Sequence, residues 1–170
     1  MTFRRLTGPD DPAVVTLAEL HMACVDEGAF MSFKKPLARD NAIRYWTKVA
    51  DRCSSGQSAV LVAEDERGLI GTVTLVLAMP DNQQHRAELV KLMVASRSRG
   101  TGLGLKLLRA AEALAVELGR TLLVLDTVTG SAAEGMYERH GWTRVGEIPS
   151  YAQGPDGVLE PATIFYRLLP

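Results

Sequence analysis

A glycine-rich segment is the part of this sequence with the clearest chemical potential. Residues 99–104 read Arg-Gly-Thr-Gly-Leu-Gly and lie between an extended apolar run, residues 89–94, and a helical run, residues 103–118. Glycine lets the backbone approach a ligand closely and adopt positive φ without strain. The following helix directs unpaired N–H groups and the positive end of its dipole into such a loop. The pattern therefore predicts a site for phosphate oxygens, and the alternative is a turn that binds nothing.

Two common phosphate-binding loops do not fit this segment. A P-loop ends in Gly-Lys-Ser/Thr, whereas Gly104 is followed by Leu105 and Lys106. The dinucleotide fingerprint follows the first strand of a βαβ unit and has an acidic residue about 20 positions further on. Asp126 satisfies that spacing. However, several strands are predicted before the loop and only one helix–strand–helix passage after it, which indicates a different fold.

The loop must be positioned by strands on both sides of it. Strands are predicted at residues 58–63, 69–77 and 86–95, and Gly68 suits the turn between the first two. The helix after the loop has a regular apolar face. Its members are Leu107, Leu108, Ala111, Leu114, Ala115 and Leu118. A buried strand at residues 121–125 follows, so strand, helix and strand should form a right-handed parallel crossover.

Further helices are predicted on either side of this central region. Asp11-Pro12 is typical of a helix start, and that helix should run to about Asp26. A second helix is predicted to open at Pro36. Ser131-Ala-Ala-Glu134 predicts a capping box at the start of a short helix.

The remaining strands complete the predicted fold. A short first strand is expected at residues 3–6, and residues 142–148 and 162–168 should form a final antiparallel pair joined by a loop at residues 149–161. The prediction is one domain over residues 1–170, of α/β (α+β) class, with a mixed and mainly antiparallel sheet of seven strands flanked by helices.

Composition restricts the class of protein. The 170 residues carry a formal net charge of −1 with the charges interspersed, so no nucleic-acid-binding patch is predicted. Cys24 and Cys53 are too few for a disulfide scaffold and are expected to be reduced thiols. The start, Met-Thr-Phe-Arg-Arg, lacks the apolar stretch of a signal peptide, and no apolar run could span a bilayer. We expect a cytoplasmic protein without a membrane partner or a metal.

Taken together, the glycine segment and its flanks resemble the GNAT superfamily of acetyl-CoA-dependent N-acyltransferases. The family signature Gln/Arg-x-x-Gly-x-Gly/Ala is matched by Arg99, Gly102 and Gly104. Upstream, residues 88–94 look like the family's fourth strand. Downstream, a second family motif is matched by Ala133, Tyr137, Gly141 and Trp142. The matches span residues 88–142, and the flanking elements follow the family's order.

A closer likeness covers the C-terminal half. From Arg86 onward the chain is similar to the tabtoxin-resistance acetyltransferases, which acetylate a β-lactam dipeptide toxin. The similarity rests on Leu125-Asp126-Thr127, Tyr137, residues 144–147 and Pro155-Asp-Gly157. One departure is that the family often has an asparagine ahead of the tyrosine helix, contacting the cofactor. Here that region is Thr129-Gly130-Ser131, in which Ser131 could supply a hydroxyl.

The resemblance implies how acetyl-CoA would bind. In the family, the fourth and fifth strands splay apart at their C-terminal ends, and the pantetheine arm lies in this V. Arg99 can meet phosphate with its planar fork, and backbone N–H groups of residues 92–94 would donate to the oxyanion. The expected cofactor-binding residues are Leu92, Met93, Val94, Arg99, Gly100, Thr101, Gly102, Leu103, Gly104, Leu105 and Ser131.

Acetyl transfer to an amine needs a base and benefits from an acid. Asp126 and Glu88 are the candidate bases, directly or through water, because their strands should be neighbours at the cleft; the tabtoxin-type resemblance favours Asp126. The alternative for Asp126 is a structural carboxylate that accepts turn N–H groups. The alternative for Glu88 is a solvated glutamate at a strand end. Tyr137 is the candidate acid for the leaving thiolate, and its alternative is packing against the sheet.

The predicted function is an acetyl-CoA-dependent N-acetyltransferase. It would move the acetyl group by direct attack in a ternary complex to the amine of a small molecule, such as an amino-acid-like toxin or antibiotic. Acetylation of a peptide or protein N-terminus is an alternative, and so is a catalytically silent acyl-CoA-binding module. A pocket closed by residues 149–161 would favour a small molecule, and an open groove a peptide. Monomer and homodimer are both compatible with the sequence.

Overall fold

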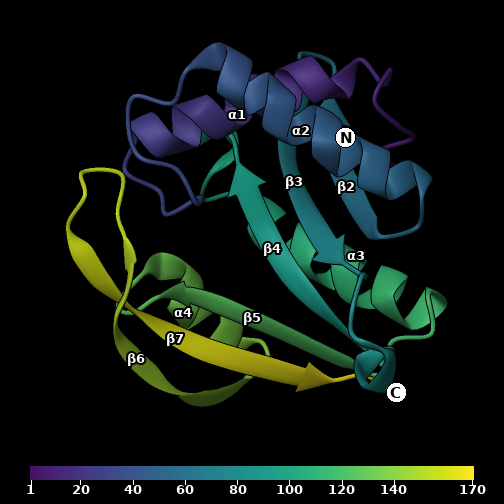
Figure 1. The fold of residues 1–170 in the computed structure, drawn as a ribbon, viewed down its shortest axis with the longest axis vertical. Coiled ribbons are helices and arrows are strands. Elements are labelled where there is room, and N and C mark those ends of the chain that lie inside the picture. The colour runs from purple at the N-terminus through teal and green to yellow at the C-terminus, as the bar shows by residue number, and fades with distance from the viewer.

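A seven-stranded sheet runs through the whole protein (Figure 1). The computed structural model describes residues 1–170. The strands lie in the order β1-β2-β3-β4-β5-β7-β6, and every neighbouring pair is antiparallel except β4 and β5. The predicted fold class is therefore confirmed. The strands are β1 (Thr2–Arg5), β2 (Ser58–Asp65), β3 (Gly68–Val76), β4 (Arg86–Val94), β5 (Leu122–Val128), β6 (Thr143–Gln153) and β7 (Leu159–Leu168).

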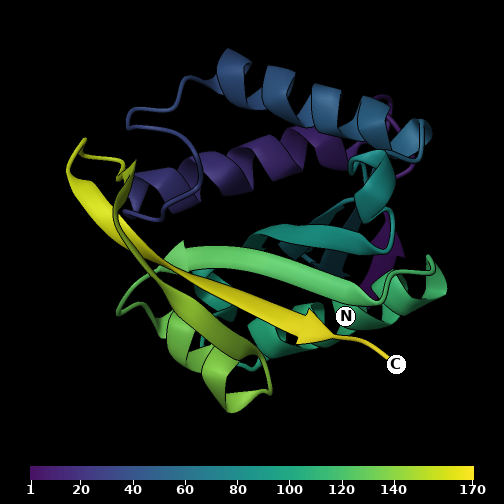
Figure 2. The same cartoon turned by 60° about the horizontal axis from the view of Figure 1, so that its bottom comes forward.

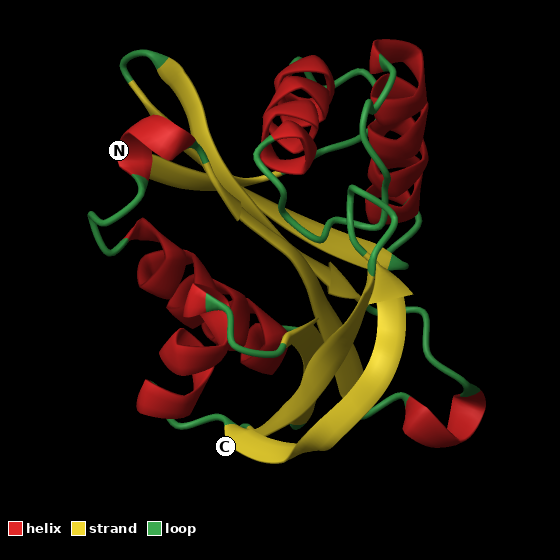
Figure 3. Cartoon of the chain, turned by 90° about the vertical axis from the view of Figure 1, so that its left-hand side faces the viewer, coloured by secondary structure: helices red, strands yellow, loops and turns green.

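Four helices cover the two faces of the sheet, two on each side (Figure 3). Alternation along β2 shows how the sequence builds both layers, since successive strand residues point to opposite faces. Leu61 and Ala63 pack on the side of α3 and α4, whereas Val60 and Val62 pack on the side of α1 and α2. The helices are α1 (Ala13–Asp26), α2 (Arg39–Ser54), α3 (Leu103–Glu117) and α4 (Ala132–Arg139). None of them is both long and apolar enough to span a membrane.

The parallel strands β4 and β5 separate soon after they begin. Only three residue pairs join them, from Arg86 with Leu122 to Glu88 with Val124. Beyond these pairs the two strands diverge, as Figure 1 shows from their common origin at the lower right. β5 continues with β7 as its partner as far as Val128, which is why it is longer than the predicted residues 121–125. The divergence leaves the end of β4 without a neighbour on that side.

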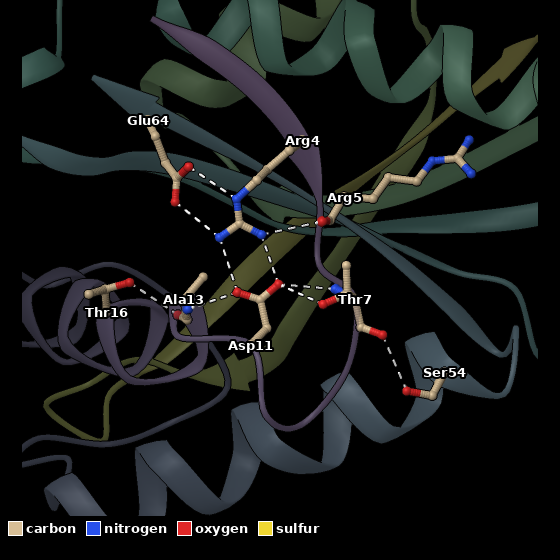
Figure 4. Close-up of polar contacts among 8 residues, drawn as sticks. All are labelled: Arg4, Arg5, Thr7, Asp11, Ala13, Thr16, Ser54 and Glu64. Atoms are coloured by element: carbon tan, nitrogen blue, oxygen red, sulfur yellow. Dashed lines mark hydrogen bonds and ion pairs between the residues drawn. The ribbon is translucent and has the colours of Figure 1, made fainter. Parts of the chain in front are cut away.

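A charged network attaches the start of α1 to the sheet (Figure 4). The Arg4 guanidinium donates to both carboxylate oxygens of Asp11, at 2.7 and 3.0 Å, and to both of Glu64, at 3.1 Å each. Asp11 also accepts the N–H of Ala13 at 2.9 Å, as the predicted helix start requires. The bond from Arg4 holds the pKa of the Asp11 carboxyl well below its usual range. Such bidentate pairs combine energy with geometric specificity, so they orient α1 on the sheet.

The predicted start of α2 is wrong. α2 begins at Arg39 rather than Pro36, because the residues before it serve tertiary contacts: the N–H of Lys35 donates to the carbonyl oxygen of Pro155.

The final hairpin is also longer than predicted, since β6 extends to Gln153 and β7 starts at Leu159. Pro149 is tolerated within β6 because β6 is the edge strand, where a missing N–H donor costs no ladder bond. An irregular register between Ile148 and Ala152 accommodates this point. Only residues 154–158 separate the two strands.

Candidate active site

A cleft of about 590 Å³ lies between the divergent ends of β4 and β5. Its walls come from five parts of the chain. They are residues 28–32 after α1, 89–92 of β4, 126–128 of β5, Ser131, Ala133 and Tyr137 at α4, and residues 151–153 and 160–162 of the β6–β7 hairpin. The strands alone would leave an open V, and the hairpin and the segment after α1 close its sides.

The glycine-rich loop forms the N-terminus of α3, as predicted. Gly102 is the N-cap residue with φ 80°, and Gly100 has φ 74°, so both occupy the left-handed region that favours glycine. A Cβ added at either position would meet no atom within 4 Å, so the space before the helix is open. The N–H groups of residues 103–105 face this end of the helix without intrahelical partners. The arrangement fits a phosphate group.

Arg99 is engaged by a carboxylate on another element. Its guanidinium pairs with Glu27, at the C-terminal end of α1, and its Nε donates to the Val94 carbonyl oxygen at 3.2 Å. The Ser96 hydroxyl also donates to Glu27. These bonds attach the loop to α1 and to the end of β4. Phosphate binding by the Arg99 fork stays a prediction.

The end of β4 presents its backbone to the open side of the sheet. The Met93 side chain is buried in the core under α1 and α2, whereas Leu92 and Val94 pack toward the core under α3 and α4. Leu92 lines the cleft, and the other two residues lie beyond it along the strand. The β3–β4 register is irregular opposite this point, between Thr72 and Thr74, which is typical of a β-bulge.

The two candidate bases lie on the same face of the sheet but in different surroundings. Leu125 and Leu89 belong to the core under α3 and α4, so Asp126 and Glu88, each adjacent to one of them, point to the α1–α2 face. Asp126 lines the cleft and is accessible to solvent there. Glu88 does not line it and accepts a bond from Arg86 at 3.0 Å. The structure thus brings Asp126 into the cleft, with Glu88 outside it.

The surroundings of Asp126 alter its acidity. Partial burial in the cleft raises the pKa of its carboxyl, the positive charge of Lys91 opposes this, and the negative charge of Glu88 adds to it. A raised pKa makes the carboxylate a stronger base than an ordinary aspartate.

Tyr137 reaches the cleft from the opposite face. Its ring packs against Trp142 and Phe165, with centroids 5.7 and 5.8 Å away, and the residue is 5% exposed. Trp142 is itself held by Glu112, whose carboxylate accepts the indole N–H at 2.9 Å. Burial and the charge of Asp126 raise the pKa of the Tyr137 phenol. The hydroxyl therefore stays protonated and can donate a hydrogen bond into the cleft.

Ser131 is the N-cap of α4, and the first half of the predicted capping box is confirmed, whereas Glu134 bonds to Gly130 instead of the Ser131 N–H. The Ser131 Oγ accepts the N–H of Glu134 at 3.2 Å and lies 3.4 Å from the Thr127 hydroxyl. The Glu134 carboxylate in turn accepts the N–H of Gly130. Ser131 lines the cleft, and its hydroxyl hydrogen is available for a ligand when Thr127 is the donor in their shared bond.

Two residues that line the cleft, Lys91 and Tyr151, were not predicted from the sequence. The Lys91 ammonium donates to the Ser32 hydroxyl at 2.7 Å. The available signal was one lysine inside the otherwise apolar run of residues 89–94. Tyr151 was placed in a loop but belongs to β6 and lines the cleft.

The tip of the β6–β7 hairpin is docked on the segment after α1. The N–H of Lys35 donates to the Pro155 carbonyl oxygen at 2.9 Å. Gly154 is buried so closely against Phe30 that an added Cβ would lie 2.5 Å from its ring. Figure 2 shows the hairpin tip beside the connection between α1 and α2. The hairpin therefore covers one side of the cleft.

Comparisons with known proteins agree with this geometry. The acetyltransferase (GNAT) family matches residues 22–142. A ribosomal-protein-alanine N-acetyltransferase from Brucella melitensis is 23% identical with a TM-score of 0.82, over 99% of this chain and 100% of that chain. The yncA protein from Salmonella typhimurium, whose structure contains its cofactor acetyl-CoA, is 22% identical with a TM-score of 0.80, over 100% and 94%. An aminoglycoside 6'-acetyltransferase type Ii is 18% identical with a TM-score of 0.74, over 100% and 99%.

The family match covers most of the chain, from within α1 to the residue that packs on Tyr137. The solved structures share the same fold over nearly the whole length. The protein belongs to the GNAT acetyltransferase family, whose members use acetyl-CoA as the acetyl donor.

Proposed function

We propose that this protein transfers the acetyl group of acetyl-CoA to the amine of a small molecule, by direct attack in a ternary complex. The observation that carries the small-molecule acceptor is the docked hairpin, in which Gly154 and Pro155 pack against residues 30–35 and cover the cleft. A peptide acceptor would need a groove that is open where this contact lies. The cleft volume, about 590 Å³, is in the usual range for small-ligand sites.

The names of the structural relatives cover both kinds of acceptor. One acts on an alanine of a ribosomal protein and another on an aminoglycoside. At these identities the relatives share a fold and leave the acceptor to be decided by the cleft itself. An amino-acid-like toxin or antibiotic, as in the tabtoxin-resistance enzymes that the sequence resembles, is within the proposed class.

On the donor side, the loop from Arg99 to Gly104 would hold the pyrophosphate through the N–H groups at the start of α3. The pantetheine arm would lie between β4 and β5, beside Ser131. Backbone N–H groups of residues 92–94 would donate to the thioester oxygen as it becomes negative. Holding both reactants in place can lower the barrier by several kcal/mol, roughly 7–11 at the upper limit.

The reaction requires two proton movements. The amine nitrogen attacks the acetyl carbonyl carbon, and the carbon–sulfur bond then breaks to release the CoA thiolate. Asp126, or Glu88 through water, would take the proton that the amine loses. Tyr137 would donate its hydroxyl hydrogen bond to the thiolate. Because an ordinary thiol has a pKa near 8.5 and the pKa of this phenol is raised, stabilisation by the hydrogen bond is favoured over complete proton transfer.

The test is a spectrophotometric assay of CoA thiol release with amino acids, antibiotics, polyamines and peptides as acceptors. Release that depends on a small amine is the expected result. Activity with peptides alone would refute the small-molecule acceptor. Tight acetyl-CoA binding without release in any reaction would identify a silent binding module.

A further inference from the structure

The strained backbone positions of this protein gather around the cleft. Three residues other than glycine have clearly positive φ: Ser32 at 68°, Lys91 at 54° and Ser150 at 53°. They belong to the segment after α1, to β4 and to β6. Ser32 and Lys91 line the cleft, and Ser150 precedes Tyr151, which also lines it. Such backbone conformations cost of order 1–3 kcal/mol each, and they cluster at active sites and ligand-binding sites. The positive φ of Lys91 therefore indicates that the surrounding structure fixes the orientation of its side chain.

The Lys91 ammonium is held in place without a carboxylate partner. It donates to the Ser32 hydroxyl at 2.7 Å and lies 5.8 Å from the centroid of the Tyr45 ring. Burial lowers the pKa of Lys91, and the charge of Asp126 acts on it in the opposite direction, without an ion pair between the two. The side chain is half-buried and its bond to Ser32 is exposed, so the ammonium stays accessible from the cleft. Ser32 accepts one N–H, and the others have no acceptor in the protein.

The charges around the cleft favour an acceptor that carries both signs. Asp126 of β5 and Glu160 of β7 are the carboxylates in its lining, and Lys91 is the cation. An amine can approach Asp126, while a negatively charged group on the same molecule can approach Lys91. An amine without an anion would leave the ammonium without a charged partner.

We propose that Lys91 is a specificity-determining residue that binds a carboxylate or similar oxyanion on the acceptor, so that the substrates are small zwitterionic amines such as α-amino acids. This inference rests on the proposed function and narrows its substrate class. Ser32 and the Tyr45 ring position the ammonium for this contact.

The experiment measures CoA thiol release with matched pairs of acceptors, α-amino acids and their carboxamides, together with polyamines and aminoglycosides as amines without an anion. The amines of the carboxamides are less basic, so a larger fraction of them is unprotonated near neutral pH, and this difference by itself favours the carboxamides. The wild type should prefer the acid of a pair by roughly 30-fold in kcat/KM. This ratio corresponds to about 2 kcal/mol, at 1.4 kcal/mol per tenfold, the lower end for truncating a buried charge pair.

Three variants locate that preference. Lys91→Met should remove it by raising KM for the acids while kcat/KM for the carboxamides stays within about threefold. Lys91→Arg should keep a large part of it. Lys48→Met, which removes an exposed lysine of α2 away from the cleft, should behave as wild type. Acetyl-CoA titration and thermal melting of each variant show whether the donor site and the fold are intact.

The outcomes separate this inference from the proposed function. A wild type that acetylates carboxamides or anion-free amines as well as acids overturns the role of Lys91 and leaves the small-molecule transferase standing. An equal loss for both members of a pair in Lys91→Met means a structural or electrostatic role and also overturns it. No acceptor-dependent release with any amine overturns the proposed function, and this inference with it. If Lys91→Met does not fold, the wild-type ratio decides the substrate class, and loss of the whole preference in Lys91→Arg overturns the role of Lys91.

Discussion

Replacing Gly102 by valine is expected to weaken acetyl-CoA binding without unfolding the protein. Gly102 caps α3 with φ 80°, and its Cβ position is open, so the new side chain would stand before the N–H groups that face the phosphate site. Gly119 offers a matched control at the other end of α3, with φ 71° and an equally open Cβ position. Both substitutions introduce left-handed strain of about 1–2 kcal/mol. Only the first obstructs the proposed pyrophosphate site.

The loss of affinity follows from the interactions that the valine would displace. A hydrogen bond to a charged group contributes about 1.5–3 kcal/mol, and an anion at a helix N-terminus gains about 0.3–1 kcal/mol more. Displacing one phosphate oxygen therefore costs about 2 kcal/mol or more. At 1.4 kcal/mol per tenfold, the dissociation constant should rise roughly 30-fold.

Isothermal titration calorimetry with acetyl-CoA on the wild type, Gly102→Val and Gly119→Val measures this effect, and melting curves measure the strain. Both variants should lose roughly 2–8 °C in Tm, since 1 kcal/mol corresponds to about 2–4 °C for a chain of this size. Gly119→Val should keep wild-type affinity. A folded Gly102→Val protein that binds acetyl-CoA as tightly as the wild type would refute the assignment of the pyrophosphate to this loop.

Three further predictions concern the chemistry and the closed side of the cleft. Because burial raises the pKa of Asp126, its carboxyl should be protonated and inactive as a base below that raised pKa, so kcat/KM falls as the pH falls. Asp126→Asn should lose about 10²–10⁴-fold in kcat/KM together with this limb, whereas Glu88→Gln should keep most activity; full rate in both would leave catalysis to positioning. Tyr137→Phe should lower kcat at least tenfold in steady-state kinetics with little change in acetyl-CoA affinity, and a wild-type kcat would remove the hydroxyl from the mechanism. Gly154→Ala places a Cβ 2.5 Å from a phenylalanine ring, so it should displace the hairpin and raise KM for a small acceptor several-fold. The control is Gly146→Ala in β6, where the Cβ meets nothing within 4 Å; equal KM values in the two variants would argue against a closed cleft.

Features that depend on neighbouring residues were predictable from the sequence. The glycine loop with the helix after it and the N-cap at Ser131 lie where their patterns predicted. Each depends on backbone geometry and hydrogen bonds within one or two turns of chain. The positions of the strands along the sequence could be predicted because alternation and turn residues are also short-range signals. The acetyl donor could be predicted because several family motifs occur in the right order.

The arrangement of the site itself was decided only by the tertiary structure. Arg99 was predicted to bind phosphate, and its pairing with Glu27, 72 residues away, was not predicted, because packing of α1 on the sheet brings that carboxylate to the loop. In the sequence, Lys91 is one polar residue in an apolar strand. In the structure, a β-bulge and a hydrogen bond to Ser32, 59 residues away, orient it into the cleft. The sequence by itself determined most of the strands and helices and the glycine loop before α3, since their causes are local. Which charges meet in the cleft, and which side of it is closed, depends on long-range packing that no local pattern contains.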